Sequence, residues 1–363
     1  MSLKFFLRQD PVLLFVTFFL VALGILMISS TDPSFALQQL IFSLLGFLVF
    51  FTVSALDHRF FKSFAFALYL FVLFLLLILP IFGEAIRGST RWINLGFFLF
   101  QPSELAKPVL ILTLAWFFDN RHSSSLKDIF LSLFFVLPYF ILVFHQPDLG
   151  NALIIFLIWV SIVFVSGLPS LFAVLGVVFA SFLLPISWFF LAAYQKARLV
   201  SFLNPTLDPL GTGYSILQSQ IAIGSGQLFG RGFGRGTQSH LAFLPARQTD
   251  FIFATLSEEL GLFGASMLLL VFFVLVIHIL DVAKISAKRF PTQISIGVAT
   301  WILVQIFINV GMNLGIVPVT GITLPLISYG GSSLISTLFG LGIINSIYHS
   351  RRQTQLTAQM SGS

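Results

Sequence analysis

The sequence predicts an all-α fold, that of a polytopic integral membrane protein with about ten transmembrane helices. Its 363 residues are 57% hydrophobic and 9% charged, with a mean hydropathy of +1.01, whereas soluble domains carry about 25% charged residues. A bilayer core about 30 Å thick needs roughly 20 apolar residues per helix. The apolar runs are continuous rather than alternating, which favours helices over a barrel. The expected helices cover about 11–29, 36–56, 60–80, 103–118, 128–144, 150–166, 170–193, 257–280, 294–316 and 331–348.

The distribution of the 19 Lys and Arg residues predicts that both termini lie in the cytoplasm. Basic residues in short loops stay on the cytoplasmic side of a membrane, and most of them fall on one side when the N-terminus is placed inside. The others cluster at about 81–107 and 194–256, so we expect these two polar segments to face outward. The net charge of +6 therefore reflects topology and outward cations rather than a nucleic-acid-binding surface.

Other features of the composition limit the chemistry and the domain organisation. Cysteine is absent, which excludes disulfides, thiol nucleophiles and iron–sulfur centres. Lys4 and Arg8 precede a long apolar run without a small-residue cleavage site, so we expect an uncleaved anchor. Residues 1–350 are predicted to form a single transmembrane domain, with a large extracytoplasmic loop at 194–256 between the seventh and eighth helices. We expect the polar tail 351–363 to be cytoplasmic and disordered.

Three ionisable residues stand at the predicted outer ends of helices. Glu104 lies in the first turn of its helix, where the helix dipole favours an anion, and Lys107 follows at the i+3 position. Asp148 lies in the short turn 145–151 and can cap the next helix. Under one interpretation, ion pairing and helix capping are enough to explain these residues, without a functional role. The alternative is a polar cavity, because an ionised side chain at membrane depth is costly without a partner.

The segment 194–256 holds the largest set of candidate ligands for an anionic substrate. Residues 213–226 predict a short amphipathic helix at the membrane surface. The sequence GRGFGRG at 230–236 predicts a flexible, cationic turn. Arginine suits a diphosphate because its planar fork donates to two oxygens at once. The candidate substrate-binding residues here are Lys196, Arg198, Gln218, Arg231 and Arg247.

Asp250 directly precedes an apolar run, and it either caps the following helix or acts in catalysis. Glu258 and Glu259 begin the next long helix and are expected to interact with its dipole. Prolines and glycines interrupt the apolar sequence at 317–330, which predicts non-helical chain that lines a cavity. The histidines lack zinc-ligand spacing, so any metal would be a hard cation such as Mg²⁺ or Mn²⁺ held by carboxylates.

Five sequence blocks, spread in order over most of the chain, resemble the SEDS family (shape, elongation, division and sporulation), and within it the RodA type. The blocks are RWINLGFFLFQPSELAK (91–107), QPDLGNA (146–152), FLNPTLDPLGTGYSILQSQIAIGSG (202–226), TDFIFATLSEELG (249–261) and GITLPLISYGGSSL (321–334). The stretch GTQSHLAFLP before Asp250 is more similar to RodA than to its division counterpart FtsW. Ala246 and Gln248 depart from the Glu and His that are common in the family.

The resemblance implies a peptidoglycan glycosyltransferase in the bacterial cytoplasmic (inner) membrane. Such an enzyme polymerises lipid II into glycan strands on the outer face during cell elongation and shape maintenance, and it releases undecaprenyl pyrophosphate. The implied partners are a class B penicillin-binding protein, the elongation machinery and membrane lipid. Asp250 matches the essential residue of the family, and Glu104, Lys107 and Asp148 match other polar positions in its central cavity.

The chemistry expected of Asp250 stays open between two roles. As a general base it would take the proton of the acceptor hydroxyl. As a metal ligand it would hold a divalent cation, Mg²⁺ or Mn²⁺, that activates the hydroxyl or neutralises the pyrophosphate. Two competing functions also stay open, a lipid II flippase or transporter and a non-catalytic scaffold for a penicillin-binding protein. The size of the segment 194–256 favours surface chemistry over transport.

Overall fold

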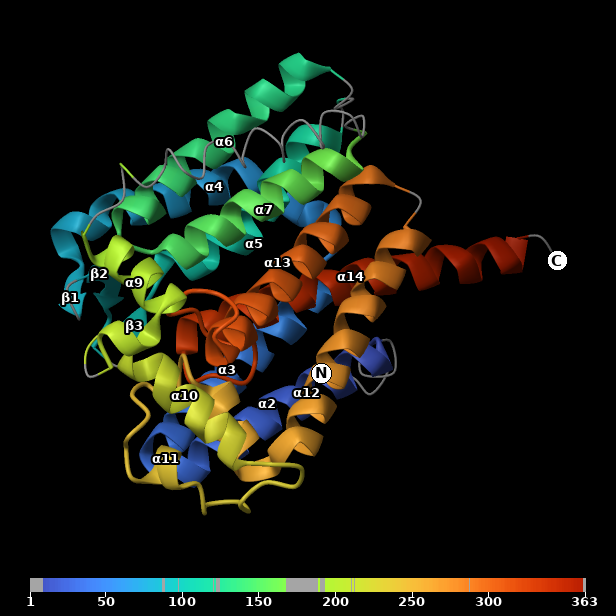
Figure 1. Ribbon diagram of the computed structural model, residues 1–363. Helices are drawn as coiled ribbons and strands as arrows, with labels where there is room; N and C mark the ends of the chain where they lie inside the picture. Colours follow the sequence, from blue (N-terminus) through green and yellow to red (C-terminus); the bar gives the residue numbers. More distant parts are fainter. Residues whose placement is uncertain are drawn as a thin grey trace.

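The fold is a bundle of long helices, with a small sheet and several short helices gathered at one end (Figure 1). The computed structural model describes residues 9–86, 89–96, 98–119, 121, 125–167, 189, 193–209, 211, 213–286 and 288–361. Seven of the described helices are long and apolar enough to cross a membrane. The predicted polytopic helical fold is therefore confirmed.

The long helices lie where the apolar runs predict them. The helix expected at 170–193 falls, except for residues 189 and 193, outside the described residues. α7 has only 17 residues, and α5 carries Glu104 and Lys107 close to its start. The helices are α2 (Pro11–Thr31), α3 (Pro33–Ala55), α4 (His58–Phe82), α5 (Pro102–Asp119), α6 (Leu126–His145), α7 (Leu149–Val165), α12 (Ile252–Ile285), α13 (Arg289–Leu314) and α14 (Gly331–Ser361).

Aspartates begin the first three long helices. Asp10, Asp32 and Asp57 occupy the N-cap positions of α2, α3 and α4, where each carboxylate accepts main-chain N–H groups of the first turn. Pro11 and Pro33 follow two of these caps at the first helical position, where a missing N–H leaves no hydrogen bond unmade. Asp32 both ends α2 and starts α3, so these two helices are joined by a single residue.

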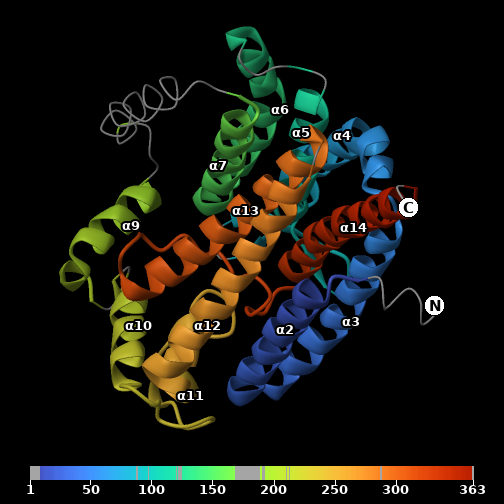
Figure 2. The same cartoon turned by 90° about the vertical axis from the view of Figure 1, so that its right-hand side faces the viewer.

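The centre of the bundle is formed by α5, α13 and α14. Within their most apolar stretches, 72% of α13 and 83% of α14 is buried, against 22% of α6. Glycines bring α14 against α3, which lie side by side in Figure 2. A Cβ at Gly46 would lie 2.4 Å from Leu338 Cδ1, and a Cβ at Gly342 would lie 2.9 Å from the Phe50 carbonyl oxygen. A side chain at Gly342 would press on the main chain of α3, and one at Gly46 would displace the side chain of Leu338, so both positions favour glycine.

The two ends of the bundle differ in what they carry. At one end the links after α3, α5 and α12 meet: Arg289 donates to the Arg121 carbonyl oxygen at 3.3 Å, and the Phe290 N–H donates to Asp119 Oδ1 at 3.0 Å. Lys62 of α4 pairs with Asp119 there. The start of α2 and the C-terminal part of α14 lie away from the strands (Figure 1). The basic short loops are thus separated from the two long polar segments, as the charge pattern requires.

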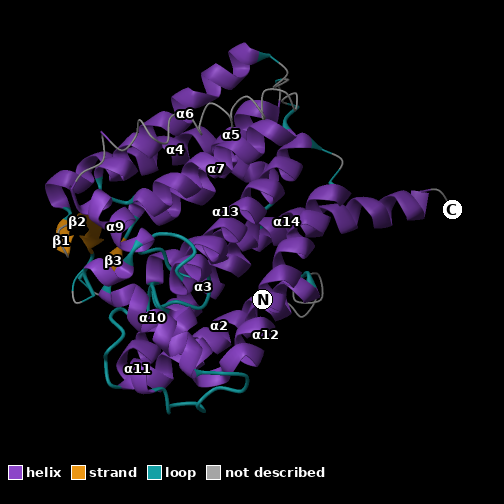
Figure 3. Ribbon diagram, in the orientation of Figure 1, coloured by secondary structure: helices purple, strands orange, loops and turns teal. Residues whose placement is uncertain are grey.

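A small antiparallel sheet, absent from the all-α prediction, lies in the polar segment 84–100 (Figure 3). Its strands are β1 (Glu84–Ile86), β2 (Ser89–Asn94) and β3 (Leu99–Phe100), in the order β1-β2-β3. β2 contains two β-branched residues and one aromatic residue, which favour strands. The prediction missed it because the strands are too short to register beside long apolar helices.

The second polar segment forms short helices and tight turns. These are α9 (Ala193–Leu203), the 3₁₀ helix η1 (Pro205–Leu207), α10 (Tyr214–Ser225) and α11 (Thr237–His240). α10 confirms the predicted amphipathic helix, and it packs against α12 and α13. The expectation of a disordered tail is wrong, because α14 continues to Ser361. The tail contains no proline or glycine before that residue, and its Gln, Leu, Ala and Met residues are good helix formers.

Candidate functional site

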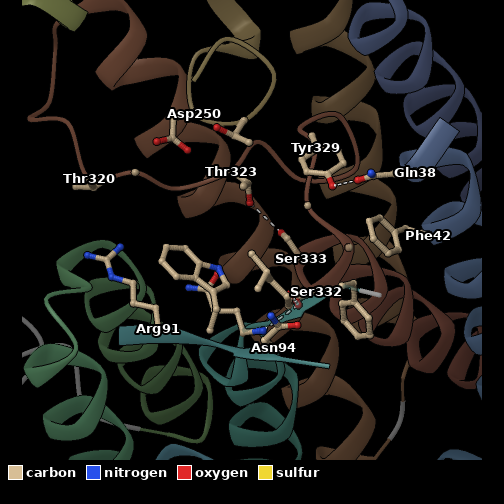
Figure 4. A pocket seen from close by; sticks show the side chains of 18 of the residues that line it. Gln38, Phe42, Arg91, Asn94, Asp250, Thr320, Thr323, Tyr329, Ser332 and Ser333 are labelled. Atoms are coloured by element: carbon tan, nitrogen blue, oxygen red, sulfur yellow. Dashed lines mark hydrogen bonds between the residues drawn. The ribbon is translucent and has the colours of Figure 1, made fainter. Parts of the chain in front are cut away.

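A cavity of about 960 Å³ opens at the end of the bundle that carries the sheet. Its lining comes from β2 and the turn that follows it, β3, the residues just before α12, the non-helical chain at 320–330 and the first turn of α14. Side chains of α3 and α9 complete it. Figure 4 shows Asp250 on one side of the cavity and Arg91 and Asn94 on the other. The polar lining residues include Gln38, Arg91, Trp92, Asn94, Gln101, Arg198, Thr249, Asp250, Thr320, Thr323, Tyr329, Ser332 and Ser333.

Two asparagines of α13 hold the main chain of Asp250. The side-chain amides of Asn309 and Asn313 each donate to the Asp250 carbonyl oxygen at 3.0 Å. Both asparagines are fully buried. The N-cap residue of α12 is Phe251, so Asp250 does not take the capping position that was one interpretation of its sequence context. Its main chain is fixed while its side chain lines the cavity.

Asn313 joins three elements at this point. Its Oδ1 accepts the Ala254 N–H at 3.2 Å, and its carbonyl oxygen accepts the Ser219 hydroxyl of α10 at 2.8 Å. Asn309 also donates to the Ile322 carbonyl oxygen at 2.7 Å. The i, i+4 spacing of the two asparagines places them on one helical face, but that spacing alone does not indicate that they clamp Asp250.

The non-helical chain at 320–330 confirms the prediction made from its prolines and glycines. The Ser328 hydroxyl donates to the Thr249 carbonyl oxygen at 2.6 Å, and the Tyr329 N–H donates to the Gln248 carbonyl oxygen at 2.8 Å. Gly321 has φ +74°, and a Cβ there would lie 3.6 Å from Asp250 Oδ2. Burial raises the pKa of the Tyr329 phenol, which donates to Gln38. This chain therefore forms a fixed wall beside Asp250.

Two arginines line the cavity. Arg198 was predicted as a substrate ligand, and its Nη1 donates to the Val319 carbonyl oxygen at 3.4 Å. Arg91 was not among the predicted ligands, although the sequence places it in a polar cluster. Its Nε donates to the Gln146 carbonyl oxygen at 2.9 Å, and its Nη1 lies 3.9 Å from Asp148 Oδ1. Both guanidinium groups are thus positioned by main-chain carbonyl groups.

Glu104 and Lys107 form a buried ion pair behind the cavity wall. Lys107 Nζ lies 2.8 Å from Glu104 Oε2, as the i, i+3 spacing predicts. It also donates to Asn151 Oδ1 at 3.1 Å and to Gln305 Oε1 at 3.2 Å, and lies 5.3 Å from the centre of the Trp301 ring. The three donors of the ammonium group therefore each have an acceptor. Neither residue lines the cavity.

Asp148 belongs to the same buried layer. It caps α7 through the Asn151 N–H at 3.3 Å, and its Oδ2 accepts from Asn151 Nδ2 at 2.9 Å. Gln101, which lines the cavity, donates to the same Oδ2 at 3.1 Å. Gln305 completes the connection on the other side by donating to the Thr323 carbonyl oxygen at 3.0 Å. Capping and network formation are thus both present, and the layer contacts the cavity through Gln101 and Thr323.

The other four predicted ligands lie outside the cavity lining. Lys196 is half-buried on α9, beside Ala197, which does line the cavity. Gln218 is half-buried on α10. Arg231 is exposed, and its Nε donates to the Ser225 carbonyl oxygen at 3.3 Å. Arg247 is half-buried near Asp32, whose pKa is lowered first by the Ser34 hydroxyl and, to a smaller degree, by the charge of Arg247.

Glu258 and Glu259 are fully buried and bind a loop rather than the helix dipole alone. Glu258 Oε1 accepts the Gln238 N–H at 2.8 Å. Glu259 Oε1 lies 3.0 Å from His240 Nε2 and accepts the Ser30 hydroxyl at 2.8 Å. The predicted dipole partners are therefore structural ligands of residues 234–240.

No group of three or more His, Asp or Glu side chains suited to a metal occurs among the described residues. Mg²⁺ and Mn²⁺ do not require such a group, because these ions bind through one or two carboxylates together with substrate phosphates and water. Asp250, in an open polar cavity with no neighbouring carboxylate in its lining, fits the single-carboxylate arrangement.

The sequence is similar to a family of bacterial cell wall proteins. The profile of the FtsW, RodA and SpoVE family, described as cell cycle proteins, matches residues 10–353. The peptidoglycan glycosyltransferase MrdB of Escherichia coli K12 is 39% identical over 348 residues, with 94% of each chain covered. The probable peptidoglycan glycosyltransferase FtsW of Geobacter sulfurreducens is 36% identical, covering 94% of this chain and 95% of that one. The stage V sporulation protein E of Bacillus subtilis is 35% identical, covering 92% and 95%.

Solved structures share the fold. A chain from a peptidoglycan synthase complex that coordinates polymerization and crosslinking has a TM-score of 0.85 and 34% identity, covering 95% of this chain and 99% of that chain. The rod shape determining protein RodA of Thermus thermophilus has a TM-score of 0.73 and 32% identity, covering 94% of this chain and 97% of that chain.

Proposed function

The chain belongs to the FtsW, RodA and SpoVE family of cell cycle proteins, and from this premise we propose that it is a peptidoglycan glycosyltransferase that polymerises lipid II at Asp250. The observation that carries the assignment to Asp250 is geometric. Its main chain is clamped by Asn309 and Asn313, while its side chain lines a cavity that also contains Arg198. A catalytic carboxylate needs this combination of fixed position and access.

The protein is a multi-pass protein of the inner membrane, and the cavity end of the bundle faces outward. The basic short loops gather at the opposite end, which supports a cytoplasmic location for that end. Lipid II carries its disaccharide above the membrane surface and its polyprenyl tail within the bilayer. A cavity at the outer end admits the sugar while the tail stays among lipids.

The reaction joins an acceptor sugar hydroxyl to the anomeric carbon of a donor. The new C–O bond forms as the bond to the diphosphate oxygen breaks, and the diphosphate leaves with the electron pair. The Asp250 carboxylate takes the proton of the hydroxyl, a form of general base assistance that gives about 10²–10⁴-fold in rate. Arg198 and Arg91 attract the departing diphosphate, because guanidinium groups pair well with its oxygens.

The second possible role of Asp250 is to hold a divalent cation in the same site. Mg²⁺ or Mn²⁺ would be held by the Asp250 carboxylate and by diphosphate oxygens, and it would neutralise the charge of the leaving group. In that case Asp250 positions the cation, and Arg198 adds to the positive charge of the cavity. Loss of activity with a chelator, restored by either cation, supports this reading over the general-base one.

The protein works with a class B penicillin-binding protein that crosslinks the new strands. Its likeness to a chain of a peptidoglycan synthase complex supports this partnership. Its similarity to MrdB and to RodA supports a role in elongation and shape maintenance.

The test is polymerisation of lipid II by the purified protein with its penicillin-binding partner and Mg²⁺ or Mn²⁺. Wild type produces glycan strands, and Asp250→Asn does not. Equal polymerisation by both proteins would remove Asp250 from the site. If neither polymerises but the wild type moves lipid II across vesicles, the protein is a flippase. If Asp250→Asn still supports crosslinking in the complex, the protein is a scaffold.

A further inference from the structure

A glycine-rich loop, residues 227–236, interlocks with a break in α12. At the break Gly261 has φ +68° and ψ −168°, outside helical geometry. The Leu262 N–H donates to the Gln227 carbonyl oxygen at 2.9 Å, and the Arg231 N–H donates to the Glu258 carbonyl oxygen at 2.9 Å. A Cβ at Gly261 would lie 2.3 Å from the Gly230 nitrogen. The loop predicted to be flexible is therefore held firmly against α12.

The break lies at one edge of the membrane. From Leu262 to Leu280 the helix has no Asp, Glu, Lys or Arg, and this run is about 28 Å long at 1.5 Å per residue. That length matches a hydrocarbon core of about 30 Å. Asp281 and Lys284 pair at the other end, 3.0 Å apart and exposed. Gly261 and the loop bound to it therefore sit at the level where the outer leaflet meets water.

The outward surface of the loop is both apolar and cationic. Phe229 is 82% exposed, and Phe233 and Leu228 are also exposed. Arg231 and Arg235 alternate with these residues and are exposed as well. A loop held by buried glutamates gains nothing in stability from displaying large apolar side chains to water. Aromatic rings with adjacent arginines are typical of the membrane–water boundary.

The apolar face of the loop continues the lipid-facing surface of α12. The Phe263 N–H donates to the Leu228 carbonyl oxygen at 3.0 Å. The main chain of Phe229 therefore lies at about the same depth in the membrane as that of Phe263. Phe263 is 68% exposed on a helix that is apolar enough to span a membrane. The surface that covers Phe263 is lipid, and it extends without interruption to the loop.

We propose that residues 227–236 anchor this end of the protein in the outer leaflet. Phe229 and Phe233 enter the interface, and Arg231 and Arg235 bind the phosphate groups of anionic phospholipids. The anchor fixes the depth of the first turns of α12, through Glu258 and Glu259, relative to the membrane surface. This role is separate from the chemistry at Asp250, so each stands without the other.

The absence of cysteine permits a direct test. Phe229→Cys, labelled with an environment-sensitive fluorophore, is reconstituted in vesicles that contain lipids with a nitroxide at the top of the acyl chain. We expect quenching within about twofold of that at Phe263→Cys, the lipid-facing control, and well above that at Lys284→Cys at the opposite end. Quenching no greater than at Lys284→Cys would overturn the proposal.

A second arm tests the arginines. A label at Phe233→Cys is quenched by phosphatidylglycerol or by phosphatidylcholine, each carrying a nitroxide on its headgroup. Attraction of about 1 kcal/mol per arginine predicts enrichment of the anionic lipid by about fivefold for each. Arg231→Gln with Arg235→Gln should reduce the preference to parity, with polymerisation in detergent unchanged. No preference in the parent protein, or shielding of the label only when the penicillin-binding partner is added, would contradict lipid binding and indicate a protein contact instead.

Discussion

The open cavity around Asp250 and the buried layer around Lys107 contain similar residue types in opposite situations. In the cavity, Asp250 and Arg198 are held through main-chain carbonyl groups, and their side chains line open space. In the buried layer, Lys107 and Glu104 pair directly and are almost fully enclosed. The first arrangement places its charged groups at the surface of the cavity, whereas the second encloses its charges within the protein. Ionisable residues near one another thus divide into those that line the cavity and those that support its wall.

The comparison predicts its largest effect at Asp250. Asp250→Asn keeps the shape of the residue and its clamped carbonyl group but removes the negative charge. We expect polymerisation of lipid II to fall by about 10²–10⁴-fold, because the general base or metal ligand is lost. Thermal stability should be unchanged, since the carboxylate is not a cap of α12. Initial rates and melting temperature of the purified protein measure both. If the melting temperature falls together with the rate, the loss of activity comes from unfolding, and Asp250 has a structural role instead.

The buried layer predicts loss of stability first. Lys107→Met keeps the length of the side chain but leaves the Glu104 carboxylate buried without its cation. Breaking one side of a buried pair costs about 3–5 kcal/mol, so the unfolding midpoint should drop strongly. Replacing both residues, Glu104→Gln with Lys107→Met, should recover much of that loss.

This double substitution also separates support from catalysis. If the pair only holds the wall, polymerisation returns with stability in the double variant. If stability returns while the rate stays more than tenfold down, the pair affects the reaction itself and the distinction between the two regions fails.

The fold and the site were predictable from the sequence to different degrees. Long apolar runs specify helices directly, because each must span a fixed thickness. Asp250 and Glu104 were recognisable as costly residues at helix ends. The position of Arg231 outside the cavity could not be predicted, because a cationic turn has the same composition whether it faces substrate or lipid. Arg91 was missed as a lining residue because its position depends on β2 and on main-chain carbonyl groups far away in the sequence.

The asparagine clamp predicts a smaller effect, with a matched control at the opposite end. Asn313→Ala removes the hydrogen bonds to Asp250 and Ala254. Each buried group left without its partner lowers the free energy of unfolding by about 1–3 kcal/mol. Asn345 is equally buried and accepts the Asp10 N–H at 2.9 Å. Both alanine variants should lose similar stability, but only Asn313→Ala should lower kcat, by about tenfold, with KM nearly unchanged. Equal kcat in the two variants would show that the clamp does not position Asp250.

The smallest expected effect concerns the cations beside the cavity. Arg198→Gln should raise KM for lipid II by about two- to fivefold, because a charge pair in an open, hydrated cavity contributes about 0.5–1 kcal/mol. Lys196→Gln, two residues away on the same helix but outside the lining, is the control and should leave KM unchanged. The effect of Arg198→Gln should shrink as salt rises from 50 to about 500 mM, since mobile ions screen the diphosphate. An equal rise in KM for both variants would mean that the charge of α9 as a whole attracts substrate, and that Arg198 has no specific position in the site.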